Sequence, residues 1–146
     1  MSELQTLTMD QVTQPINPPD GTWLATILSG KTKPGRGDNG PEKRYLFALS
    51  MLAPEKDVSQ AEIDARGSIA DYNTVYYEIP HFDKRAYWYL KKFALASGLS
   101  EASMEGVTPE AIPGLLKNHQ ILITGQETHE EGRDPRWVVS SYAAAV

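Results

Sequence analysis

Five short segments with alternating apolar and polar residues, and one helical pattern between the third and the fourth, constrain the fold more than any other feature. These segments cover residues 22–29, 44–52, 71–80, 119–127 and 136–143. Alternation with a period of two is typical of β-strands that turn one face to a core. Around residues 83–97 the period becomes helical, with Asp83 as the N-cap and Gly98 just past the end. A second short helix is predicted for residues 109–117.

This order of elements predicts an all-β domain with one main helix. Five short strands with a helix between strands 3 and 4 are typical of the OB-fold, a small Greek-key barrel. An alternating α/β sandwich would need a helix between nearly every pair of strands. The 146 residues favour one domain. We assign residues 1–19, which contain three prolines, to a flexible N-terminal arm and residues 20–146 to the OB-fold domain.

The charges are unevenly distributed along the chain. The net charge is −5, from 14 basic and 19 acidic residues. Residues 31–44 nevertheless hold five basic and two acidic side chains, and residues 83–92 hold four basic side chains and one acidic. Two positive segments on an acidic body can attract phosphate locally while the rest of the surface repels it. The simpler alternative is that these cations only fill loops and helix faces.

The positive segments and several aromatic rings predict a site for unpaired nucleic acid. OB-folds bind oligonucleotides or oligosaccharides on the face of strands 2 and 3, between the loop joining strands 1 and 2 and the loop joining strands 4 and 5. Residues 31–42 are rich in glycine and proline, so we expect them to form the first of these loops. Cations would hold the backbone, and rings would stack on bases. The predicted binding residues are Lys31, Lys33, Arg36, Lys43, Arg44, Tyr72, Tyr76, Arg133, Arg136 and Trp137.

The aromatic residues do not all favour a role in binding. Tyr72 and Tyr76 are expected to point outward from the third strand, although packing on a sheet explains tyrosines there equally well. Trp23 alternates in phase with core positions, and the place of Trp137 stays open because both faces of its strand are apolar. Residues 87–89 are Tyr-Trp-Tyr, and on a helix three consecutive residues cannot all be buried. At least one of them should lie at a surface.

Catalysis finds no support in the residue pattern, and we predict that the chain is not an enzyme. It has no cysteine, and its three histidines lack the spacing of metal ligands. The glycines of residues 35–40 lack the lysine and hydroxyl of a P-loop, so neither a metal nor a cofactor is expected. No apolar run is long enough to span a membrane, and the first residues do not resemble a signal peptide. These features predict a cytoplasmic protein.

Four loose motifs resemble the OB-fold single-stranded DNA-binding proteins of bacteriophages and their uncharacterised relatives. They are the opening GTWLATI, the strand RYLFALSML, the helix end LKKFALASGL and the late strand NHQILITGQE, and together they fall within residues 20–143. The resemblance implies that the protein coats unpaired DNA during phage DNA replication or recombination, in the cytoplasm of the host cell. Many such proteins recruit partners through an acidic C-terminal tail, whereas this sequence has no acidic side chain after Asp134.

The sequence is therefore compatible with two functions. The first is single-stranded DNA binding with little dependence on sequence, compatible with a homodimer and with replication or recombination proteins as partners. The alternative is an OB-fold module that binds a host or phage protein, in which the acidic charge discourages nucleic acid. Binding that weakens steeply with salt would indicate phosphate contacts and favour the first function.

Overall fold

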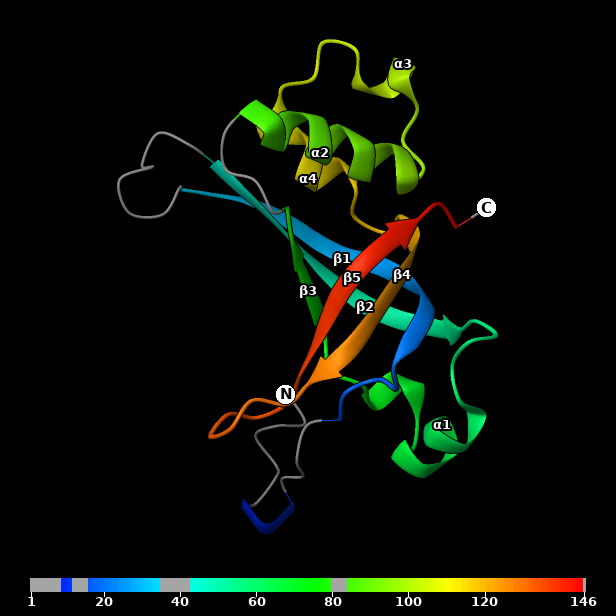
Figure 1. The fold of residues 1–146 in the computed structure, drawn as a ribbon. Coiled ribbons are helices and arrows are strands. Elements are labelled where there is room, and N and C mark those ends of the chain that lie inside the picture. Colours follow the sequence, from blue (N-terminus) through cyan, green and yellow to red (C-terminus); the bar gives the residue numbers. More distant parts are fainter. Residues whose placement is uncertain (1–8, 12–15, 35–42, 80–83, 146) are drawn as a thin grey trace.

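The chain forms a five-stranded antiparallel sheet in the strand order β3-β2-β1-β4-β5 (Figure 1). The structure is a computed structural model that describes residues 9–11, 16–34, 43–79 and 84–145. The strands are β1 (Gly21–Pro34), β2 (Lys43–Pro54), β3 (Val75–Glu78), β4 (Gln120–Thr128) and β5 (Arg136–Ala143). All five predicted strands are present, and β5 has the predicted bounds.

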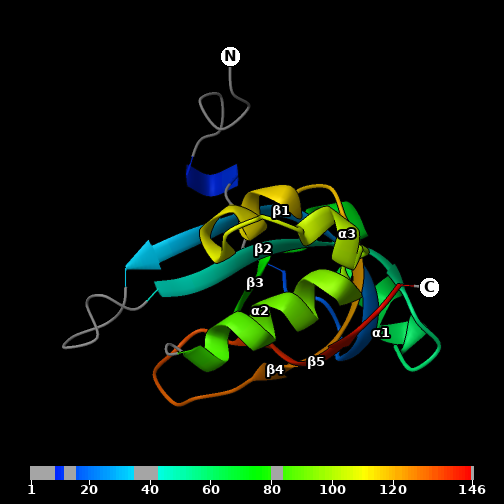
Figure 2. The same ribbon diagram turned by 90° about the horizontal axis from the view of Figure 1, so that it is seen from above.

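The helices gather at the two ends of the sheet (Figure 1). One end holds α1 (Gln60–Arg66), between β2 and β3. The other holds α2 (Lys84–Ala96), α3 (Glu101–Met104) and α4 (Ile112–Leu115), all between β3 and β4 and seen from above in Figure 2. Short 3₁₀ turns cover Met9–Gln11, Ile69–Asp71 and Pro109–Ala111. The main helix is therefore where the sequence predicts it, and the short second one is confirmed as a 3₁₀ turn followed by α4.

The end of α2 follows the predicted glycine stop. Gly98 has a φ of +98°, and the Leu99 amide donates to the Ala94 carbonyl over 3.1 Å. This bond, which reaches back five residues, belongs to the Schellman motif and satisfies a carbonyl of the last turn. The predicted N-cap, Asp83, lies outside the described residues.

The core lies between the inner face of the sheet and α2. Trp23, Ala25 and Ile27 of β1 are fully buried, as are Tyr45, Phe47 and Leu49 of β2, which confirms the predicted alternation. The Phe47 ring lies 4.5 Å from the Phe93 ring of α2. Burial of large aromatic side chains such as these dominates core stability.

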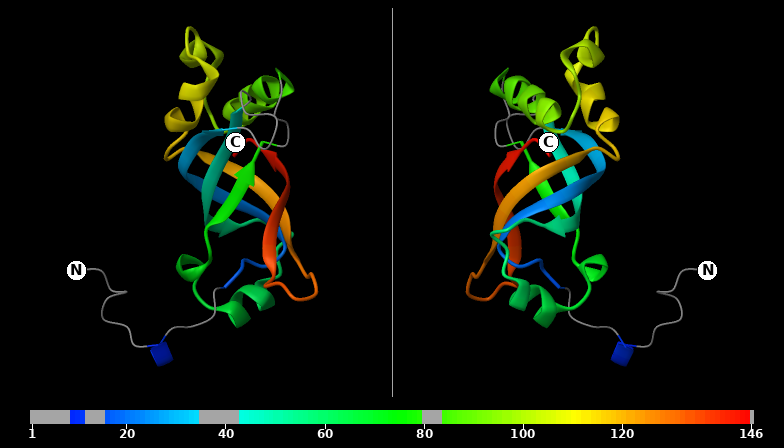
Figure 3. Two further views of the ribbon diagram at one scale, coloured as in Figure 1. Left: turned by 90° about the vertical axis from the view of Figure 1, so that its left-hand side faces the viewer. Right: turned by 90° about the vertical axis from the view of Figure 1, so that its right-hand side faces the viewer.

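The sheet is strongly curved, which brings its edge strands β3 and β5 toward each other (Figure 3). Within the described residues no ladder of backbone hydrogen bonds joins these two edges, so the sheet is not closed. The Tyr77 ring of β3 nevertheless lies 5.7 Å from the Tyr142 ring of β5. The part of the predicted Greek-key barrel that the structure shows is thus a curved five-stranded sheet with an open seam between β3 and β5.

Residues 16–19 pack against the domain, although the sequence analysis assigned them to the arm. Ile16 bridges to Tyr72, and the Trp23 indole N–H donates to the Pro19 carbonyl over 3.0 Å. The Asn17 side chain donates to Glu127 Oε2 over 3.0 Å. The packed part of the chain therefore includes Ile16. Residues 1–8 and 12–15 of the predicted arm lie outside the described residues.

Candidate nucleic-acid interface

Strand β1 continues beyond its predicted end and carries two predicted phosphate ligands with it. The sequence analysis placed Lys31 and Lys33 in a loop, but both lie on β1, opposite Leu46 and Arg44 of β2. The prediction of a loop from residue 31 was wrong because pairing with β2 extends the hairpin as far as Pro34. Arg36 lies outside the described residues.

The outer face of β1, β2 and β3 carries rows of side chains that cross the three strands. Ser29 lies opposite Ala48, which lies opposite Tyr76 of β3. In the next row Lys31 lies opposite Leu46, which lies opposite Glu78. Neighbouring strands are about 4.8 Å apart, so each row spans about 10 Å.

A hollow of about 370 Å³ lies on this outer face. Because the side chains in the Ser29 row are small apart from Tyr76, the surface beside the tyrosine ring stays open. Its lining residues, from three strands, are Ser29, Lys31, Lys33, Leu46, Ala48 and Tyr76. We call it the sheet-face hollow.

Adjacent tyrosines on β3 lie on opposite sides of the sheet. Tyr76 is 61% exposed, which confirms its predicted outward position. Tyr77 packs inward against Phe93 with 5.3 Å between ring centroids, and burial raises the pKa of its hydroxyl to about 12. The two-residue period of a strand accounts for this contrast. Tyr76 is thus the β3 tyrosine with an open ring face.

The cations of the sheet face differ in how they are paired. Within the described residues, neither Lys31 nor Lys33 makes an ion pair or a side-chain hydrogen bond. Arg44, in contrast, lies 3.2 Å from the Glu78 carboxylate and donates to the Pro34 carbonyl over 2.9 Å. For Lys43 the structure describes the backbone, which lies opposite Pro34. The two lysines are therefore available to an anion, whereas Arg44 holds the stem of the hairpin.

A second hollow, of about 780 Å³, lies at the seam between β3 and β5. Tyr76 lines this seam hollow as well as the sheet-face hollow, so the two hollows share this residue. Arg136 lines the seam hollow, is exposed and makes no ion pair within the part of the chain that is described. The full lining is Asn17, Asn73, Thr74, Val75, Tyr76, Glu78, Pro135, Arg136, Trp137 and Val138.

Two of the predicted stacking rings are not open platforms. Trp137 is only 6% exposed, and its ring lies so close to Gly125 that a Cβ there would be 2.6 Å from it. Tyr72 is half-buried and meets the Trp23 ring edge to face at 5.7 Å. The predicted outward position of Tyr72 on the third strand was wrong because β3 begins only at Val75, so the alternation of the strand does not reach residue 72.

The turn between β4 and β5, where the sequence analysis places the binding residues Arg133 and Arg136, also carries acidic side chains. Arg133 lies 3.4 Å from the carboxylate of Glu130. His129 lies 3.3 Å from Glu127, which also accepts from Asn17. From residue 129 to 136 the chain has three acidic and two basic side chains, or −1 with histidine neutral. Of the two arginines there, Arg136 is the one whose side chain is unpaired among the described residues.

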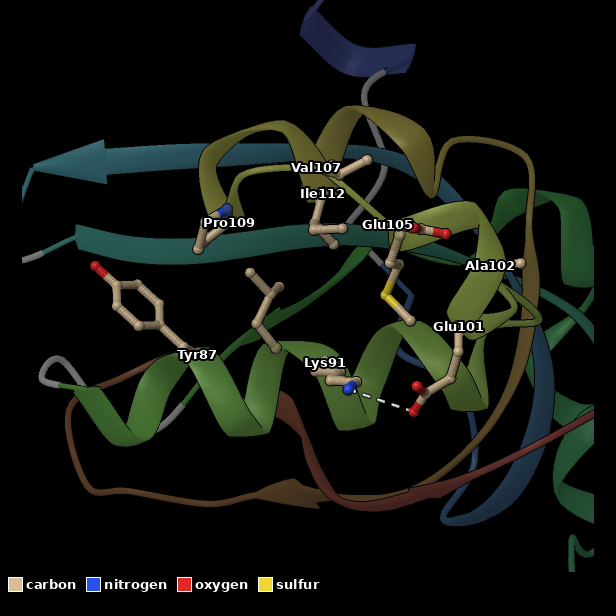
Figure 4. Close-up of a pocket in the computed structure, with 10 residues that line it drawn as sticks. Tyr87, Lys91, Glu101, Ala102, Glu105, Val107, Pro109 and Ile112 are labelled. Carbon is tan, nitrogen blue, oxygen red and sulfur yellow. Dashed lines mark ion pairs between the residues drawn. The ribbon is translucent and has the colours of Figure 1, made fainter.

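A third cavity, of about 530 Å³, lies between α2 and the segment from α3 to α4 (Figure 4). Its lining is mainly apolar and includes Leu90, Met104 and Ile112. At its edge the Lys91 ammonium lies 3.3 Å from the Glu101 carboxylate. None of the predicted site residues lines this cavity.

Among the described residues, no group of three or more acidic or histidine side chains could hold a metal ion. None of the helices that the structure describes is long and apolar enough to cross a membrane. No family model matches the sequence, and neither does any curated protein.

Sequence reasoning missed the neutral residues that shape the two hollows. Ser29 and Ala48 leave the Tyr76 ring uncovered, and Asn73 and Thr74 line the seam. Small and neutral side chains carry no chemical signal of their own in a sequence. Only the strand register, which places residues 29, 48 and 76 in one row, shows their contribution.

Proposed function

We propose that this chain is a single-stranded DNA-binding protein that holds an unpaired strand across the outer face of β1, β2 and β3 with little dependence on sequence. The observation that carries the proposal is that Lys31 and Lys33 of β1 and Tyr76 of β3 line one hollow. Unpaired lysines beside an open ring supply both interactions that such binding needs, phosphate contact and base stacking.

The architecture supports an OB-fold for this domain. Helices stand between strands 3 and 4, and β1 is central, between β2 and β4. At the seam, Thr74 and Val75 line a hollow with Arg136 and Trp137, while Tyr77 meets Tyr142 further on. Residues near the start of β3 thus lie near the start of β5, and a residue further along β3 meets one further along β5. The two edge strands therefore run in the same direction on either side of the seam, as expected of a partly open barrel. OB-folds bind oligonucleotides on the face of strands 2 and 3.

The chemistry of the face favours binding that tolerates any sequence. Lysine ammonium groups recognise phosphate as point charges, and every base has a flat surface that can stack on tyrosine. The resemblance to phage single-stranded DNA-binding proteins supports a role in phage DNA replication or recombination in the host cytoplasm. Homodimers and replication or recombination proteins as partners are compatible with this role.

A salt titration of oligothymidine binding tests the proposal. For single strands, log K falls with log salt by about 0.7 for each phosphate neutralised, so K31A/K33A should reduce the magnitude of the slope by about 1.4. The affinity should fall equally for oligothymidine and mixed sequences, because phosphates carry no sequence information. Fluorescence anisotropy of a labelled oligonucleotide measures both quantities.

The matched control is K56A/K117A, which removes the same charge from two exposed lysines that line neither hollow. It should leave the slope near that of the unaltered protein. Equal effects of the two double variants would show that only the total charge matters and would remove the sheet face from the proposal. If the unaltered protein binds no oligonucleotide even at low salt, the alternative of a protein-binding module is favoured.

A further inference from the structure

The outward face of α2 carries an exposed tryptophan. Trp88 is 62% exposed, whereas Trp23 is fully buried and Trp137 is 6% exposed. Leu90, Phe93 and Ala94 form the buried stripe of α2. At about 100° per residue, Trp88 lies about 160° from Leu90, so its ring points away from the core. Burial in the fold therefore does not explain this aromatic residue.

Basic residues surround Trp88 on the helix, which contains no acidic residue. Lys92 follows it by four residues and Arg85 precedes it by three, so both lie on the same face. Both are exposed, and within the described residues Lys92 makes no ion pair. The third cavity lies on another side of α2, where Glu101 pairs with Lys91 (Figure 4). The outward face thus combines an open ring with positive charge on a molecule of net charge −5.

The length of the intervening chain limits the distance between this face and the sheet face. Tyr76 and Glu78 lie on β3, and α2 begins at Lys84. Extended chain spans at most about 3.5 Å per residue and a helix rises about 1.5 Å per residue, so the Cα atoms of Tyr76 and Trp88 are at most about 35 Å apart. At the stacked spacing of a duplex, roughly 3.4 Å per nucleotide, a 16-mer is about 54 Å long and covers even this upper limit, whereas a 6-mer is about 20 Å long. One OB-fold binds about 4 to 16 nucleotides.

From these observations we infer that Trp88 and Lys92 of α2 form a second contact for the same unpaired DNA strand, one that longer oligonucleotides reach and short ones do not. This inference rests on the proposed function. Trp88 would stack on a base, and Lys92 would contact a neighbouring phosphate. Positive charge around the Trp88 ring favours a polyanion as the binding partner of this face over a protein surface with few acidic residues. Linking two contacts on one strand raises the affinity through effective concentration.

The test compares oligothymidines of 6 and 16 nucleotides on the full chain, with anisotropy for affinity and tryptophan emission as a local signal. Because Trp88 is the exposed tryptophan, the 16-mer should quench emission and W88A should remove most of that change. W88A should weaken binding of the 16-mer roughly 5- to 150-fold, the range expected for one stacked base, and leave 6-mer affinity unchanged. K92A should weaken the 16-mer alone and to a smaller extent.

L95A is the matched control, since Leu95 is a 38% exposed apolar side chain on the same helix with no ring to stack. It should bind both oligonucleotides as the unaltered protein does. If W88A leaves 16-mer affinity unchanged while K31A/K33A still weakens binding, the inference fails and the proposed function stands. If the unaltered protein binds neither oligonucleotide, the proposed function fails first. If W88A instead converts a dimer to a monomer in sedimentation without changing DNA affinity, the face serves self-association and the inference is overturned.

Discussion

The sequence predicts nucleic-acid binding for two regions that differ in structure. One is the outer face of β1, β2 and β3, and the other is the turn between β4 and β5. Both regions combine basic residues with an aromatic ring. On the sheet face Lys31 and Lys33 are unpaired within the described residues and the Tyr76 ring is open. At the turn, Arg133 is paired with Glu130 and the nearby Trp137 is buried. The two regions therefore differ in how available these groups are, and not in which groups they contain.

The largest expected effect concerns the aromatic residue of the turn region. W137A should lower the free energy of unfolding by about 3–5 kcal/mol, the usual cost of replacing a buried Trp or Phe with Ala. The reason is that the ring packs on Gly125 of β4 and helps to cover the core. Chemical denaturation measures this change, and W137F should recover part of the stability. A stable W137A protein with weakened DNA binding would instead make Trp137 a ligand and break the comparison.

The next effect concerns the aromatic residue of the sheet face. Y76A should weaken oligothymidine binding about 5- to 150-fold, because one stacked base contributes roughly 1–3 kcal/mol. It should change the free energy of unfolding by no more than about 0.5 kcal/mol, as is usual for an exposed position. Y76F retains the ring and serves as the control for stacking. Equal loss of affinity in Y76A and Y76F would assign the effect to the hydroxyl.

The smallest effect separates two arginines of the turn region. R136A should reduce the magnitude of the salt slope by about 0.7, the value for one phosphate. Arg136 is unpaired in the described chain and lines the seam hollow. R133A should leave the slope unchanged and, because exposed ion pairs contribute little, should alter stability by less than about 1 kcal/mol. Salt titrations of both variants check this, and the opposite ranking would refute the role assigned to pairing.

Most of the secondary structure followed from patterns that act over a few residues. Alternation in β1 and β2 correctly identified the buried Trp23 and Phe47, because successive side chains of a strand point to opposite faces. Gly98 correctly marked the end of α2, because its positive φ suits glycine. The short α3 was not predicted, since its four residues give too little periodicity to recognise.

The errors lie where partners distant in sequence decide the outcome. Lys31 and Lys33 belong to a strand because β2 pairs with them, which the glycines and prolines that follow them obscured. Tyr72 turned inward because Trp23 and Ile16 meet it there. Arg44 is engaged because Glu78, which is 34 residues further along the chain, lies within reach of it.

By itself the sequence determined which side chains enter the core and where the main helix ends, because hydrophobic periodicity and glycine conformation act locally. Tertiary structure alone decided which cations stay unpaired and which rings stay open. Those properties depend on strand register and on the contacts between β3 and β5, and no short stretch of sequence encodes either. Lys31 and Tyr76 lie 45 residues apart along the chain and, together with Lys33, line one hollow only because β2 lies between β1 and β3.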